Sequence, residues 1–128
     1  MHKKYIIAAA YLGALTVAIG AFGAHAIKDK ISGDAYSIFE TAVKYQFYHV
    51  FALLGAGILY NSFPNKLINA SGKLFIAGII LFCGSLYLLT YFKNAGNISF
   101  DWIGAITPFG GLCFIAGWVC LAIGISKS

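Results

Sequence analysis

Charged side chains are scarce in this sequence, and arginine is missing from it altogether. Only 10% of its 128 residues are charged, while 60% are hydrophobic. A soluble domain carries about 25% charged residues, because water must solvate its surface. Such a low charge content excludes an ordinary soluble fold and indicates that lipid covers much of the chain. The sequence therefore predicts an integral membrane protein.

The missing motifs exclude several kinds of chemistry. The lysines stand mostly at the ends of apolar runs and form no clustered basic face, so we expect no nucleic-acid partner. Cys83, Cys113 and Cys120 lie inside apolar runs and form no C-x-x-C pair, which excludes a thioredoxin-like pair and a zinc knuckle. G-x-S-x-G and H-E-x-x-H are absent too, which argues against hydrolysis. We assign no catalytic residue, no metal and no cofactor, and favour a protein that is not an enzyme.

Four apolar segments are long enough to cross a bilayer, which takes about 20 helical residues. They cover residues 5–27, 44–60, 73–92 and 103–125. Short polar connections between them make consecutive helices antiparallel neighbours. We predict an all-α fold, an integral membrane four-helix antiparallel bundle that forms one domain over residues 1–128.

Two features at the ends of these segments need a decision. Ala24-His25-Ala26 has the A-x-A form of a signal-peptidase site, but the segment before it is longer than a signal-peptide core, so we expect a retained helix. Residues 34–43 alternate apolar and charged positions at helical spacing. They predict a short amphipathic helix between spans 1 and 2, at the membrane interface or as an extension of the second span.

The lysines give a weak orientation. Five lie on the side of the two chain ends, against three on the other side, not counting Lys44 within the second span. The positive-inside rule then places both termini in the cytoplasm, with the protein in the inner or plasma membrane.

Small residues at helical spacing predict where the helices touch, because helices in lipid associate by close packing. The packing glycines that we single out are Gly20, Gly23, Gly110, Gly117 and Gly124. The first span carries a second small stripe as well, made of Tyr11, Ala14, Ala18, Ala21 and His25. Two small faces indicate a helix held by protein on both sides, so we expect His25 to point at protein.

Polar side chains inside the spans predict a pocket near one membrane face. The candidate ligand-binding residues are His25, His49, Tyr45, Ser85, Tyr87 and Thr107. Thr107 also precedes Pro108, so we expect it to cap the fourth helix. Ionisable groups within a bilayer usually face a bundle interior or a wet cavity. Three interpretations stay open: interhelical glue, a pocket for a ligand or a proton, and bis-histidine haem ligation.

Four ordered motifs carry a family resemblance. GAFGAHAIKDK, TAVKYQFYHVFALL, FCGSLYLLTYF and GAITPFGGLCFIAGW together resemble the domain of unknown function 423 family, small membrane proteins also called transmembrane-protein-256-like. The resemblance implies a four-helix membrane protein and supplies no activity. The family-like positions are Gly20, Gly23, His25, Tyr45, His49, Gly84, Ser85, Tyr87, Thr107, Pro108, Gly110, Gly111, Gly117 and Trp118.

From the sequence we therefore hypothesise a small membrane protein whose His/Tyr/Ser pocket binds a small ligand or lipid headgroup or relays protons. The alternative is an assembly or scaffold subunit with its histidines as glue, and a haem- or quinone-binding subunit ranks third. The expected partners are the lipid bilayer, such a ligand, and a second copy in a homo-oligomer.

Overall fold

The chain is built from four helical rods. The computed structural model describes residues 2–96 and 98–128, and every regular element in these ranges is helical. The first rod is α1 (Lys3–Phe22) with the π-helical turn η1 (Gly23–Ile27), and the second is α2 (Gly33–Leu59). The third joins α3 (Lys66–Gly78), the π-helical turn η2 (Ile79–Cys83) and α4 (Gly84–Asn94). The fourth joins the 3₁₀ helix η3 (Ile98–Ala105) to α5 (Thr107–Ser126).

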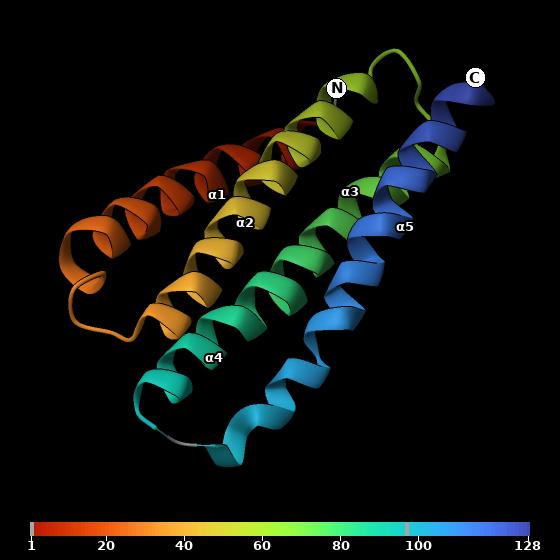
Figure 1. Ribbon diagram of the computed structural model, residues 1–128. Coiled ribbons are helices and arrows are strands. Elements are labelled where there is room, and N and C mark those ends of the chain that lie inside the picture. Colours follow the sequence, from red (N-terminus) through yellow and green to blue (C-terminus); the bar gives the residue numbers. More distant parts are fainter. Residues whose placement is uncertain (1, 97) are drawn as a thin grey trace.

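The rods lie side by side in the order α1, α2, α3–α4 and α5 (Figure 1). Each runs antiparallel to the next, and the two chain ends lie at the same end of the molecule (Figure 1). The α2 helix and the third rod occupy the middle, and much of the core comes from them, including Leu53, Ala56, Phe75 and Cys83. The α1 and α5 helices form the edges, which leaves one side of each open to lipid.

Polar side chains set the starts of two helices. The backbone N–H of Ala35 donates to Ser32 Oγ over 3.1 Å at the start of α2. At the start of α3, Asn65 Oδ1 accepts from the backbone N–H groups of Leu67 and Ile68. Both are N-caps of the usual kind, which satisfy N–H groups that have no partner inside the helix.

The short interfacial helix expected between the first two spans is not a separate element. Residues 34–43 form the first part of α2, which continues without interruption to Leu59. Their apolar side packs inside the protein, with Ala35, Phe39 and Ala42 buried. Phe39 covers Gly23, where any larger side chain would collide with its ring. This contact holds the segment against α1, so the extension of the second span is the reading that the structure supports.

Three rods are long and apolar enough to cross a membrane, judged by length and composition over the described residues: Lys3–Ile27, Lys66–Asn94 and Ser99–Ser126. The predicted span in α2 does not meet that criterion, because Lys44, Gln46 and His49 lower its hydropathy. Gln46 and His49 are buried against neighbouring helices. A central helix can carry such groups, since protein rather than lipid surrounds them.

The five predicted packing glycines all lie against another helix. Their neighbours are Val43 for Gly20, Phe39 for Gly23, Phe82 for Gly110, Phe75 for Gly117 and Ile68 for Gly124. Gly110 brings two backbones together, because a side chain there would meet the backbone of Phe82 in η2. The second small face of α1 has no such neighbour: Tyr11, Ala14, Ala18, Ala21 and His25 are all exposed. The expectation that protein holds both faces is therefore not met within the single chain.

Candidate functional site

His49 is bonded on both sides of its ring. Its Nε2 accepts from the indole N–H of Trp118 over 3.1 Å, and its Nδ1 lies 2.7 Å from the carbonyl oxygen of Tyr45. The indole can only donate and the carbonyl can only accept. His49 is therefore a neutral imidazole with its proton on Nδ1, and neither nitrogen has a lone pair or proton left for a ligand.

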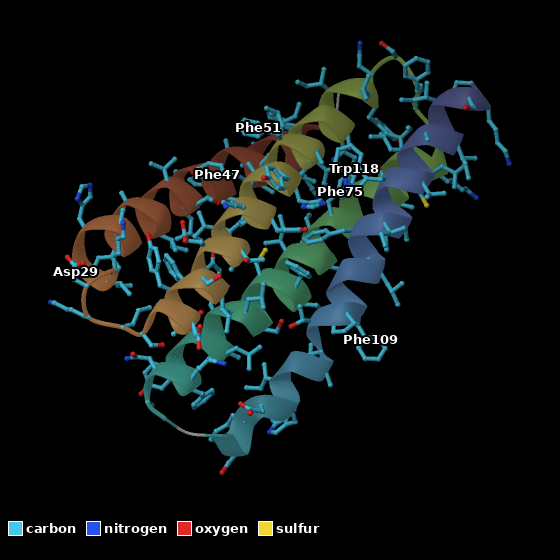
Figure 2. All side chains as sticks on the ribbon, viewed as in Figure 1. Asp29, Phe47, Phe51, Phe75, Phe109 and Trp118 are labelled. Atoms are coloured by element: carbon cyan, nitrogen blue, oxygen red, sulfur yellow. The ribbon has the colours of Figure 1, made fainter. Side chains whose placement is uncertain are left out.

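Aromatic rings close the space around His49. The ring of Phe114 stacks on the imidazole at 3.5 Å between centroids and an interplanar angle of 9°. Phe75 lies 5.8 Å from the imidazole and 5.2 Å from Trp118, and Figure 2 shows Phe75 and Trp118 together between the third rod and α5. The exposed fraction of His49 is 5%, so no ligand-sized space adjoins the ring.

A second polar chain crosses three rods beside His49. Tyr87 donates from its hydroxyl to Gln46 Oε1 over 2.7 Å, and Gln46 Nε2 donates to Thr16 Oγ1 over 2.7 Å. Thr16 in turn donates to the carbonyl of Leu12 in its own helix. Gln46 and Thr16 are both buried. The chain ends on a carbonyl, which has no proton to pass on, so this geometry joins helices and does not relay protons.

Ser85 and Thr107 form a third polar contact. Their hydroxyl oxygens are 2.6 Å apart, and Ser85 also donates to the carbonyl of Phe82. This pair joins α4 to the start of α5. Thr107 is not the N-cap that the sequence predicted, because it is already the first residue of α5 and no side chain caps that helix. The preceding η3 helix leads directly into α5, which leaves the threonine free to bond across to α4.

The structure separates His25 from His49. Gly13 of α1 lies against Val50 of α2, and Gly23 lies against Phe39. His25 is therefore 12 residues beyond the level of His49, about 18 Å along the rod. The expected shared pocket is corrected accordingly. The sequence placed the start of the second span near Lys44. The α2 helix instead begins at Gly33, so His49 lies in the middle of the rod.

The remaining candidates are split between these contacts. His25 is exposed on η1. Tyr45 has 39% of its side chain exposed, and its ring lies 4.7 Å from Phe82 and 6.4 Å from His49. Tyr87 belongs to the Gln46 chain, and Ser85 pairs with Thr107. The structure therefore places the six candidates in three separate contacts and one exposed position.

Sequence reasoning missed Gln46 and Thr16 as functional polar residues, and it missed Trp118 as the partner of His49. A signal for Gln46 was present, since it is an uncharged polar residue inside the predicted segment 44–60, directly after Tyr45. Thr16 lies at helical spacing from Gly20 and Gly23 on the same face of the first span, where a hydroxyl needs a partner. Trp118 could not be assigned, because 69 residues separate it from His49.

The space nearest to the candidates is a surface groove. It has a volume of about 520 Å³, lies between α4 and η3, and is lined by side chains that include Ser85, Tyr87, Leu88 and Trp102. Its lining is mostly apolar. Within the described part of the chain no three metal-binding side chains come together, and His25 and His49 are too far apart to bind one haem iron.

Comparison of the sequence with known proteins identifies a family. The family model described as "Protein of unknown function (DUF423)" matches residues 19–111. A UPF0382 membrane protein of Staphylococcus aureus (strain bovine RF122 / ET3-1) is 41% identical over 98% of this chain and 97% of its own. The UPF0382 membrane protein YwdK of Bacillus subtilis (strain 168) is 36% identical over 98% of each chain. A UPF0382 membrane protein of Haemophilus influenzae is 38% identical over 100% of this chain and 98% of its own.

These matches confirm the resemblance predicted from the four motifs. No solved structure matches the chain. The names of the relatives state a membrane location and no activity.

Proposed function

We propose a structural role in the membrane for this chain, which belongs to the DUF423 family of proteins of unknown function. In this proposal the protein acts as a packed helical subunit for membrane assembly, and its buried polar groups fix the helices relative to one another. One observation carries the proposal: both ring nitrogens of His49 are used inside the chain, one by Trp118 and one by Tyr45.

The other buried polar groups support the same role. Gln46 joins Thr16 and Tyr87, and Ser85 meets Thr107. No buried side-chain nitrogen or oxygen of the described residues lacks a hydrogen-bond partner. A binding site normally keeps some polar groups for its ligand, whereas these groups are already paired.

The experiment compares His49→Leu with the matched control His25→Leu in purified protein. The proposal predicts that His49→Leu lowers the thermal midpoint, because Trp118 and the Tyr45 carbonyl lose their partner. His25→Leu, at an exposed position, should leave the midpoint unchanged. A Soret band in the wild-type protein that disappears in His49→Leu would instead support haem binding and overturn the structural role.

A second candidate function rests on the groove between α4 and η3. Its volume of about 520 Å³ and its apolar lining fit an acyl or isoprenoid chain, with the paired Ser85 hydroxyl at its wall. Gly84 lines the groove, and a side chain there would meet nothing within 4 Å. Gly84→Leu should therefore fill the groove without straining the fold.

The matched control is Gly55→Leu, because Gly55 also has open space around it and lies outside the groove. Lipids that remain bound after detergent purification are extracted and quantified by mass spectrometry. Loss of one lipid class in Gly84→Leu alone supports the candidate. Equal lipid content in the two variants rules it out.

Localisation and assembly remain proposals. We place the protein in the bacterial inner or plasma membrane with both termini in the cytoplasm, on the bias of the lysines toward that side. Reporter fusions at each terminus test the orientation. A second copy is the partner proposed for the exposed small face of α1, and the mass of the detergent-solubilised particle tests this.

A further inference from the structure

The two halves of the molecule differ completely in charge. The half with both chain ends carries five lysines and no acidic side chain: Lys3, Lys4, Lys66, Lys73 and Lys127. The other half carries four lysines together with all four acidic residues of the sequence. The net charge of +5 therefore belongs entirely to one half, called here the basic half. Figure 2 labels Asp29 at the opposite end, in the connection between α1 and α2.

The fold fixes this separation through contacts among all four rods. The backbone N–H of His2 donates to the carbonyl of Gly57 over 2.8 Å, which holds the start of α1 to the end of α2. Tyr5 donates to the carbonyl of Asn69 over 2.7 Å. Asn65 donates to the carbonyl of Gly124 over 3.0 Å. The lysines of α1, α3 and α5 are thus held around one end of the molecule.

All five lysines of the basic half are exposed. A pocket of about 350 Å³ lies at this end, lined by His2, Lys3, Lys4 and Tyr60. Hydrogen-bond donors from two helices line this pocket, and its size fits a headgroup. No acidic side chain stands in it to repel an anion.

Apolar side chains continue from the lysines toward the middle of the rods. Ile7, Ile58 and Ile123 are exposed on α1, α2 and α5, each within about one turn of the basic end of its helix. A ligand that fits this surface needs an anionic group above an apolar chain. We propose that the basic half binds the headgroups of anionic phospholipids, whose acyl chains lie along these exposed apolar side chains.

The physical basis is the attraction between lysine and an anionic leaflet, which falls off within a Debye length of the surface. The neutral half supplies no such attraction, because its lysines are balanced by carboxylates. The two surfaces should therefore select different lipids in one bilayer. The proposal is independent of the structural role of His49, since the hydrogen bonds of that residue go to Trp118 and Tyr45 and involve none of the five lysines.

The test uses the full chain in nanodiscs that mix phosphatidylglycerol with phosphatidylcholine in equal parts. Native mass spectrometry counts the lipids of each kind that stay bound. One variant combines Lys3→Gln, Lys4→Gln and Lys66→Gln, which removes both lysines that line the pocket. The matched control combines Lys28→Gln, Lys30→Gln and Lys93→Gln, which removes as many lysines from the neutral half.

We expect the wild-type protein to retain phosphatidylglycerol in an excess of about fivefold, the attraction that one surface lysine supplies. The excess should fall in the basic-half variant and persist in the control, and added salt should reduce it. Equal retention of the two lipids by the wild-type protein would overturn the proposal, as would an equal loss of the excess in both variants. Circular dichroism checks that all three proteins stay helical.

Discussion

The indole N–H of Trp118 donates to Nε2 of His49 over 3.1 Å and so joins α5 to α2, two rods that flank the third in the array. The bond needs the lone pair of Nε2 and therefore goes with a neutral His49 ring. It also explains why a histidine and a tryptophan stand at mid-span in a sequence otherwise so apolar.

Replacing Trp118 by phenylalanine should destabilise the protein by about 0.6 to 2 kcal/mol. The ring contact with Phe75 is kept, but Nε2 of His49 loses its donor. Thermal unfolding in detergent measures the loss. The double variant His49→Phe/Trp118→Phe removes both partners and should cost less than the sum of the single variants. Strictly additive effects would mean that the bond contributes nothing.

Gln46→Leu should cost more, about 1 to 4 kcal/mol, because it removes two interhelical hydrogen bonds. The Tyr87 hydroxyl would lose its acceptor, and Thr16 Oγ1 would lose its donor while it keeps its own bond to the Leu12 carbonyl. The control is Thr41→Val, which removes only an exposed bond to the Ser37 carbonyl in the same helix. The free energy of unfolding is measured for both variants. If the two lose the same stability, the Gln46 chain does not join the helices.

Gly110→Ala should lower stability by roughly 1 to 3 kcal/mol, because its methyl group would collide with the backbone of Phe82. A backbone cannot turn aside as a flexible side chain does. Gly84→Ala and Gly55→Ala are matched controls in the same kind of helix, since a methyl group at either position meets nothing within 4 Å. Their stability should be unchanged or slightly higher. An equal loss in all three would assign the effect to something other than close packing.

Asn65→Ala should speed the hydrogen exchange of backbone amides at the start of α3. Asn65 accepts from two backbone N–H groups and also donates to the Gly124 carbonyl. We expect a cost of about 1 to 2 kcal/mol, read locally as faster hydrogen exchange of the Leu67 and Ile68 amides. Ser32→Ala is the control, since it removes a cap from α2 without a bond to another rod. Unchanged exchange at Leu67 and Ile68 would contradict the capping role.

The sequence predicted the helical class and the four apolar segments, because composition and the length of apolar runs are local properties. It placed the start of α2 too late, because the charges of Asp34, Glu40 and Lys44 resemble those of an interfacial helix. The packing of Phe39 on Gly23 holds residues 34–43 against α1 as the first part of α2. That contact depends on how α1 lies against α2. The late start then placed His49 near the end of the rod that carries His25, whereas it lies in the middle of α2.

His25 shows a different limit of sequence reasoning. The small residues of α1 follow two faces, and the sequence gives no sign of which one a neighbour covers. Only the order of the rods makes α1 an edge helix, with Thr16 buried and Ala18 exposed. Trp118 shows the same limit, since the pairing of α2 with α5 depends on depth and rotation, which hydropathy does not record.

The π-helical turn η2 separates α3 from α4 and shifts the rotational phase of the side chains between them. A π-helical turn holds an extra residue, and one residue of an α-helix turns the side-chain direction by about 100°. Deleting one residue from Ile79–Cys83 would make the rod a uniform helix and rotate α4 relative to α3 by that angle. Tyr87 would then point away from Gln46, and Ser85 away from Thr107. The rotational phase of α4 relative to α3 thus sets both polar contacts of α4. A one-residue change in the length of η2 should therefore disturb the structure more than most substitutions.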